Sequence, residues 1–353
     1  MSPTQRLLTV DQITDLVRQS LGSSARVKDL DELGGGGFAS VWRVLLADGS
    51  TVVLKTSPPP DATLLGYERG LLAVEAEYFA RIARELPGLP VPEVLHHGTD
   101  RQWCDGDWML TTLLPGTALS ALSAGARDAG VRRELGEALA RVHTLEGPEF
   151  GYPGEGRRRA STWRAAYLGI VDDLLADAER LDWALPVPGA EIRQAVGEAA
   201  DVLDLVRRPA LVHFDLWDGN VLAAPDHAGE LRLTGLVDGE RCLYGDPLVD
   251  LVSPVLFGAI ENEPEHPLLR GYAGADGWHW DDSAVARIRL YRLWLYLVMY
   301  VEIPTRGMDN PGNAAAVAHR ATLLRDALAA VRKGGSGDQD GSPRAIPGRP
   351  GIG

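Results

Sequence analysis

The most constraining feature of this sequence is a run of polar residues at fixed offsets between apolar pairs, in residues 211–222. The run reads Leu-Val-His-Phe-Asp-Leu-Trp-Asp-Gly-Asn-Val-Leu and contains His213, Asp215 and Asn220. A His-x-Asp pair at the end of a strand is often a structural hydrogen-bonded pair, so the run alone leaves a structural and a chemical interpretation equally open. The rest of the chain has to decide between them.

A second apolar run, residues 231–237, ends at Asp238. With Asp215 and Asn220, it supplies two carboxylates and an amide oxygen. ATP-dependent phosphoryl transfer uses one such group to orient the attacking hydroxyl and two to hold magnesium. The two runs therefore favour phosphoryl transfer as a hypothesis.

Size and composition limit the class of protein. At 353 residues the chain suits two lobes with sizeable cores, and its 45% hydrophobic and 24% charged residues are typical of a soluble globular protein. No apolar run is long enough to cross a bilayer, and residues 1–10 lack a signal-peptide layout. Cys104 and Cys242 form neither a disulfide framework nor a metal-binding spacing. We therefore expect a cytoplasmic protein that does not bind membranes.

The net charge bears on the partners. With 49 acidic and 35 basic residues, the formal net charge is -14. This argues against nucleic acid, whose phosphates require a basic surface. It is compatible with a small cationic substrate, although many proteins are acidic for solubility alone. Nothing in the sequence indicates an obligatory protein partner.

The amino-terminal third predicts a small antiparallel sheet. Apolar residues at helical spacing predict a helix over residues 10–21, and residues 26–56 read as three strands joined by tight turns. The Gly-rich segment 33–41 lies between the first two strands. Such a turn lets backbone N–H groups approach phosphate oxygens, although flexible Gly-rich turns are also common.

Lys55 stands among Val and Leu on the third strand, where an unpaired charge would be unfavourable. It therefore requires an anionic partner, either a phosphate or a carboxylate. The apolar pattern of residues 71–86 predicts a helix that carries Glu75 near its buried side, within reach of Lys55. A solvated position for Glu75 is the alternative.

Residues 107–116 predict a further strand that ends at Pro-Gly, and we place the end of the first lobe at residue 115. The backbone of Thr112 and Leu114 could bond a purine edge, although an ordinary strand and turn fits equally well. Residues 116–332 are predicted to form a mainly helical lobe. Its helices are expected over residues 128–143 (capped by Asp128), 162–183, 188–206, 252–260, 283–302 and 314–331. Residues 333–353 are expected to be disordered.

The order of these motifs resembles the protein-kinase-like fold. Residues 33–41 resemble the kinase Gly-rich loop, with Ala39 in place of its third glycine, and residues 52–55 resemble its lysine strand. Residues 213–220 look like the His-Gly-Asp-Leu-x-x-x-Asn loop of the aminoglycoside phosphotransferase and fructosamine kinase family, with Phe214 in place of the glycine.

The resemblance continues beyond this loop. The segments Val-Asp-Gly-Glu-Arg at 237–241 and Gly-Asp-Pro-Leu-Val-Asp-Leu at 245–251 resemble the metal-binding segment and the following turn of that family. The Ala-Pro-Glu motif of protein kinases is missing, which argues against a protein substrate.

The resemblance implies an α+β, bilobal protein-kinase-like fold, with a small antiparallel sheet and helix in the N-lobe and a larger, mostly helical C-lobe. It implies an ATP- or GTP-dependent phosphotransferase that acts on a hydroxyl of a small molecule, foremost an aminoglycoside-like or other antibiotic. A metabolite kinase for a sugar, a fructosamine-type adduct or an amino sugar is the alternative. A non-catalytic nucleotide-binding protein is a third possibility.

The resemblance also assigns roles. Asp215 is expected to orient the acceptor hydroxyl and take its proton, and Asn220 and Asp238 are expected to bind Mg²⁺. His213 is expected to brace the loop. The residues expected to bind the nucleotide are Gly34, Gly36, Gly37, Phe38, Ser40, Lys55, Glu75, Thr112 and Leu114. The residues that could contact the substrate, each of which also suits a surface or core role, are Asp172, Asp173, Trp163, Glu240 and Trp278.

Overall fold

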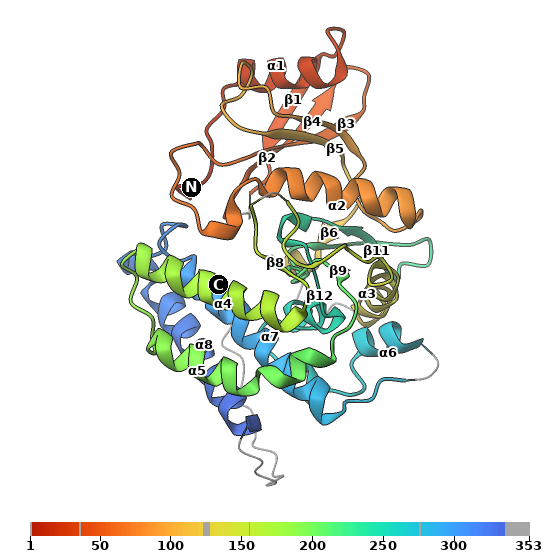
Figure 1. Cartoon of the computed structure of the whole chain (residues 1–353). Helices are drawn as coiled ribbons and strands as arrows, with labels where there is room; N and C mark the ends of the chain where they lie inside the picture. Colours follow the sequence, from red (N-terminus) through yellow and green to blue (C-terminus); the bar gives the residue numbers. More distant parts are fainter. Residues whose placement is uncertain (1, 35–36, 123–127, 155, 275–276, 336–353) are drawn as a thin grey trace.

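The computed structural model describes residues 2–34, 37–122, 128–154, 156–274 and 277–335. A smaller part built around one sheet stands above a larger, mainly helical part (Figure 1). All strand pairs are antiparallel. The predicted α+β class and its uneven division between sheet and helices are therefore confirmed.

The smaller part contains a five-stranded sheet in the order β1-β2-β3-β5-β4. Its strands are β1 (Val27–Glu32), β2 (Ser40–Leu46), β3 (Thr51–Thr56), β4 (Val94–Gly98) and β5 (Trp108–Thr112). Helix α1 (Val10–Leu21) begins at a capping box formed by Thr9 and buries Ile13, Leu16 and Val17 with one face of the sheet. Helix α2 (Leu71–Glu85) packs with Met109 of β5 in a separate core cluster.

The larger part is organised around α7 (Asp282–Val301), whose apolar residues are buried almost all round, as its sequence predicts. The neighbouring helices are α3 (Ala129–Val142), α4 (Trp163–Arg180), α5 (Gly189–Ala199), α6 (Pro267–Ala273) and α8 (Ala314–Gly335). The short strands are β6 (Thr117–Ala118), β7 (Phe150–Gly151), β8 (Arg159–Ala160), β9 (Ala210–Val212), β10 (Val221–Pro225), β11 (Leu231–Leu236) and β12 (Leu243–Gly245).

Strands β10 and β11 position the end of the polar run in residues 211–222. Strand β10 pairs with β11 so that Val221 lies opposite Leu236. Beyond this pair, the N–H of Val237 donates to the carbonyl of Asn220 at 3.1 Å. The hairpin therefore brings Asn220 and Asp238 to the same end, because antiparallel pairing places the start of one strand beside the end of the other.

Several local predictions were wrong. Residues 252–260 form short 3₁₀ turns instead of a helix, in a stretch where Pro254 provides no backbone donor. Asp128 does not cap α3, because its carboxylate accepts a hydrogen bond from Arg132 Nε at 2.8 Å. Residues 333–335 complete α8, whereas the rest of the predicted disordered tail lies outside the described residues. No helix in the described ranges is both long and apolar enough to cross a membrane.

Candidate active site

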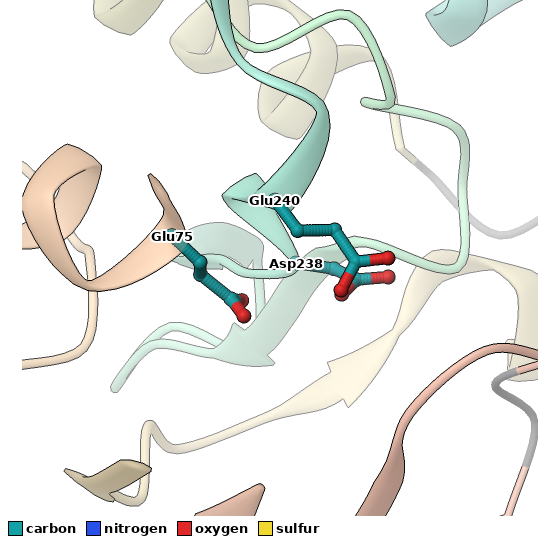
Figure 2. A group of neighbouring side chains, drawn as sticks. All are labelled: Glu75, Asp238 and Glu240. Atoms are coloured by element: carbon teal, nitrogen blue, oxygen red, sulfur yellow. The ribbon is translucent and has the colours of Figure 1, made fainter. Parts of the chain in front are cut away.

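The ammonium of Lys55 lies among three carboxylates. Its Nζ donates to Glu75 Oε2 at 2.7 Å, to Asp238 Oδ1 at 2.5 Å and to Glu240 Oε2 at 2.8 Å. Figure 2 shows Glu75 of α2 facing Asp238 and Glu240, which lie just beyond β11. The predicted pairing of Lys55 with Glu75 is confirmed, and the same lysine joins the sheet to the strand-end Asp238.

This cluster has more negative than positive charge. Burial raises the pKa of Glu75 and Glu240, although Lys55 lowers both, and the neighbouring carboxylates raise them further. Burial would also raise the pKa of Asp238, but the charge and hydrogen bond of Lys55, together with Arg241 and His213, lower it. Oxygens of the three carboxylates lie within 4.8 Å of one another. Because the Lys55 ammonium contacts all three carboxylates, it already occupies the space between them. The donors that suit a hard divalent cation here are the carboxylate of Asp238 and the amide oxygen of Asn220.

His213 and Asp250 brace the loop that carries Asp215. The buried carboxylate of Asp250 accepts the N–H groups of His213 at 2.8 Å and Phe214 at 2.6 Å, and it bonds His143 Nε2 at 3.0 Å. His213 Nε2 lies 3.1 Å from the carbonyl of Val237 and therefore donates to it, while Nδ1 accepts the N–H of Asp215 at 3.3 Å. The bracing role predicted for His213 is confirmed.

The structure explains Phe214. Its φ of 68° lies in the left-handed region, which favours the glycine found in the family loop. The ring is 1% exposed and stacks on Trp294, with ring centroids 4.0 Å apart. The buried ring and the hydrogen bonds of the backbone N–H groups of His213, Phe214 and Asp215 therefore hold a backbone conformation that is unfavourable for a residue with a side chain.

Asp215 lies between an amide and a guanidinium. Asn220 Nδ2 donates to the carbonyl of Asp215 at 2.8 Å, which leaves Asn220 Oδ1 available as a ligand. Arg241 Nε lies 3.6 Å from Asp215 Oδ2. Burial raises the pKa of Asp215 to about 7, against the opposing effect of Arg241. A carboxylate with this pKa can accept a proton near neutral pH.

An ionic network beside Asp215 was missed by the sequence analysis. Arg241 Nη2 donates to Glu302 Oε2 at 2.8 Å, and Arg306 pairs with Glu302 at 3.4 Å and with Glu68. These side chains come from three distant segments, so no local spacing could have indicated that they meet.

The Gly-rich segment lies against this network. The guanidinium of Arg306 stands 4.9 Å from the centroid of the Phe38 ring, and a side chain at Gly37 would meet Arg306 at 3.7 Å. Gly34 faces open space, and Gly36 lies outside the described residues. The Ser40 hydroxyl does not face a ligand, because it bonds the backbone N–H and carbonyl of Arg6 at 2.7 and 2.8 Å.

The predicted nucleobase segment is only partly available. The N–H of Thr112 donates to the carbonyl of Glu93 at 3.0 Å, and its hydroxyl accepts the N–H of Glu93 at 3.0 Å. That N–H is therefore not free for a base, and the predicted contact through the Thr112 backbone stays a prediction for its carbonyl. The backbone of Leu114 has no hydrogen bond to any described residue. Leu114 therefore stays a candidate for contact with a base.

The residues predicted to meet a substrate are scattered. The Trp163 ring is 0% exposed and donates to Tyr291 Oη at 2.8 Å, so its predicted stacking on a substrate is wrong. Asp172 pairs with Arg193 on α5 at 2.7 Å, and Glu240 bonds Lys55 instead of facing the acceptor. Trp278 packs edge-on against Trp280. Of these five, Asp173 alone lines the cavity of about 530 Å³ beside α4.

Comparison with known proteins agrees with this geometry. Residues 29–286 match the model of the phosphotransferase enzyme family, abbreviated APH. A Staphylococcus aureus protein named as a ketoamine kinase is 26% identical over 315 residues, which cover 80% of this chain and 93% of that protein.

Solved structures share the fold. A Thermobifida fusca YX-ER1 protein named as a fructosamine-3-kinase has a TM-score of 0.60 at 23% identity, covering 92% of this chain and 100% of its own. A thermostable aminoglycoside phosphotransferase APH(4)-Ia, in ternary complex with AMP-PNP and hygromycin B, has a TM-score of 0.56 at 18% identity, covering 93% of this chain and 100% of its own.

Because the family model covers more than half of the sequence, this chain belongs to the phosphotransferase enzyme family. The chain is a small-molecule phosphotransferase, as the sequence predicts.

Proposed function

We propose that this protein transfers the terminal phosphate of a nucleoside triphosphate to a hydroxyl of a ketoamine, with Asp215 as the group that aligns the hydroxyl and takes its proton. The observation that carries this proposal is the contact of Lys55 with Glu75 and Asp238, beside the braced Asp215 loop. A phosphotransferase needs a fixed cation for phosphate and a carboxylate near neutral pKa for the hydroxyl.

The proposed nucleotide site uses both parts of the molecule. Lys55 would hold phosphate oxygens, with Gly34 and Gly37 covering them and Leu114 meeting the base. Asn220 and Asp238 would hold magnesium, with Glu240 adjacent, and the ion would neutralise phosphate charge there. Residues 1–115 would then form the nucleotide-binding lobe, and residues 116–332 the lobe that holds the acceptor. Bound AMP-PNP in the related aminoglycoside phosphotransferase supports a nucleotide as the donor.

A ketoamine is the favoured acceptor because the protein named as a ketoamine kinase aligns over 93% of its length. An antibiotic hydroxyl is the second candidate, since the structure bound to hygromycin B has the same fold.

ADP release with fructosamines, aminoglycosides, macrolides and free sugars tests the proposal. With the accepted compound, Asp215→Asn should lower kcat by at least about 10²-fold while nucleotide affinity changes little, because it removes only the proton acceptor. Asp238→Asn should instead weaken magnesium–nucleotide binding about tenfold or more. Asp172→Asn, which changes an exposed carboxylate paired with Arg193, is the matched control.

Two results would overturn the proposal. Near-normal turnover by Asp215→Asn would remove that carboxylate from the mechanism. Turnover of an aminoglycoside or macrolide, without turnover of any fructosamine, would replace the ketoamine with an antibiotic as the acceptor.

A further inference from the structure

A cavity of about 530 Å³ opens between α4, the segment before β8 and the 3₁₀ turn Gly66–Glu68. Its volume lies in the range of small-molecule sites. Tyr67 and Tyr152 form one wall, with stacked rings whose centroids are 5.6 Å apart. The cavity therefore combines a flat apolar wall with the charged side chains around it.

The charged residues of this cavity do not balance. Three arginines and two aspartates line the cavity, so these side chains carry one net positive charge. They are Arg157, Arg158, Arg159, Asp173 and Asp177. Both aspartates already have partners. Arg158 donates to both Asp173 oxygens at 2.6 and 2.9 Å, and Asp177 accepts a hydrogen bond from Arg180 at 2.6 Å. Asp177 also accepts the N–H of Gly66 at 2.7 Å. Neither carboxylate is therefore free to bind a cationic ligand.

Arg157 is the unmatched charge. Its Nη1 donates to the carbonyl of Tyr67 at 2.9 Å, while Nη2 is shielded from solvent and has no hydrogen-bond partner in the described structure. No described carboxylate forms an ion pair with it. The buried hydroxyl of Tyr67 likewise has no hydrogen-bond partner among the described residues. Unpaired polar groups of this kind are unfavourable until a ligand or water satisfies them.

The tyrosine wall lies close to the proposed reaction centre. Glu68, the residue after Tyr67, pairs with Arg306, and both Arg306 and Arg241 pair with Glu302. The same Arg241 lies 3.6 Å from Asp215. A molecule whose hydroxyl meets Asp215 could therefore extend past Arg241 into the cavity.

We propose that the cavity binds a carboxylate of the acceptor, remote from the reacting hydroxyl, through Arg157 and the Tyr67 hydroxyl. A planar guanidinium matches a carboxylate, and one excess positive charge suits a monoanion better than a phosphate dianion. Resting on the proposed ketoamine kinase function, this inference specifies the substrate class: a sugar adduct of an amino acid that keeps its carboxylate.

Fructosylglycine and fructosylglycinamide are a matched pair of acceptors that differ in the carboxylate alone. The wild type should use fructosylglycine with a KM at least about tenfold lower, because a charge-assisted hydrogen bond is lost with the amide. In Arg157→Gln the ratio of the two KM values should fall to about one, and Arg157→Lys should restore part of it. Arg164→Gln, which changes an α4 arginine that lies outside the cavity and pairs with Asp204 at 2.8 Å, should leave the ratio unchanged.

Calorimetric binding of both compounds to the AMP-PNP-loaded protein separates the two proposals. Turnover of both compounds with equal KM, or a ratio unaffected by Arg157→Gln, would overturn the carboxylate site and leave the kinase function standing. If neither compound is phosphorylated, the ketoamine function fails. In that case, tighter binding of fructosylglycine that Arg157→Gln abolishes would still support the site, and equal binding would reject it. Unchanged melting temperatures would show that the variants are folded.

Discussion

At the scale of single residues, Phe214 shows how burial can hold an unfavourable backbone conformation. Its φ of 68° would suit glycine, yet the ring is stacked on Trp294 and its N–H is held by Asp250 at 2.6 Å. The packing of the ring offsets the strain of the left-handed conformation. The loop can therefore hold a left-handed backbone conformation at residue 214 without a glycine there.

Two substitutions separate packing from strain at this position. Phe214→Gly should lower the free energy of unfolding by about 3 kcal/mol, because the cavity it leaves costs more than the strain it relieves. Phe214→Ala should lower it by about 1 kcal/mol more, because alanine keeps the strain and also leaves a cavity. Urea denaturation of both variants measures the difference. Equal stability, or a more stable alanine variant, would show that φ at 214 is not strained.

At the scale of elements, residues 3–6, which precede α1, lie across the Gly-rich turn and form what we call the strap. The buried Thr4 donates from Oγ1 to the carbonyl of Gly37 at 2.9 Å, and Arg6 exchanges two backbone hydrogen bonds with the Ser40 hydroxyl. Pro3 also lies against Gly307 of the larger part. Because Gly37 has no side chain to anchor it, the strap restrains the turn that we propose covers the phosphates.

Loss of one strap contact should weaken nucleotide binding. Thr4→Val keeps the shape of the side chain but cannot donate to Gly37, so the KM for the nucleotide should rise about threefold, which corresponds to a hydrogen bond of modest net strength. The KM for the acceptor should stay constant. Thr14→Val on α1, whose hydroxyl bonds Val10, is the control. A nucleotide KM equal to that of the control would mean that the strap does not restrain the turn.

At the scale of the whole molecule, buried ion pairs join the two parts. Arg306 follows α7 in the larger part and pairs with Glu68, which precedes α2, while Glu302 links Arg306 to Arg241 beside Asp215. The side chains of Arg306 and Glu68 are 7% and 0% exposed. A buried pair contributes specificity of arrangement, and removing one partner leaves an uncompensated charge.

Arg306→Met should therefore destabilise the protein by about 3–5 kcal/mol and raise the KM for the nucleotide, because Glu68 loses its partner and Phe38 loses its cation. Adding Glu68→Gln should recover part of the stability, because the buried Glu68 carboxylate, which has lost its partner, is then replaced by a neutral amide. Arg133→Met, from an exposed pair with Glu137, should change the melting temperature little. If the double variant is no more stable than Arg306→Met, the pair does not act as a unit.

The prediction of the fold from sequence succeeded where local pattern decides structure. The helix at residues 10–21 follows from its capping box and apolar spacing, and the β2–β3 pair follows from alternation and the tight turn at residues 47–50. The prediction of a helix at residues 252–260 failed because apolar residues that are buried in a large core can show the same spacing as a helix. At this place Pro254 and tertiary packing favour 3₁₀ turns instead.

By itself, the sequence determined the groups whose partners lie a few residues apart in one loop, as Asp215 and Asn220 do. It also indicated a helix that could bring Glu75 to Lys55, while a solvated Glu75 stayed open until the packing of α2 decided it. Only the tertiary structure decided that Glu240 turns toward Lys55, that Arg306 meets Glu68 across 238 residues, and that Arg157 pairs with no carboxylate among the described residues. Contacts of that kind depend on how distant segments pack, and the stability of a buried charge depends on which neighbours that packing supplies.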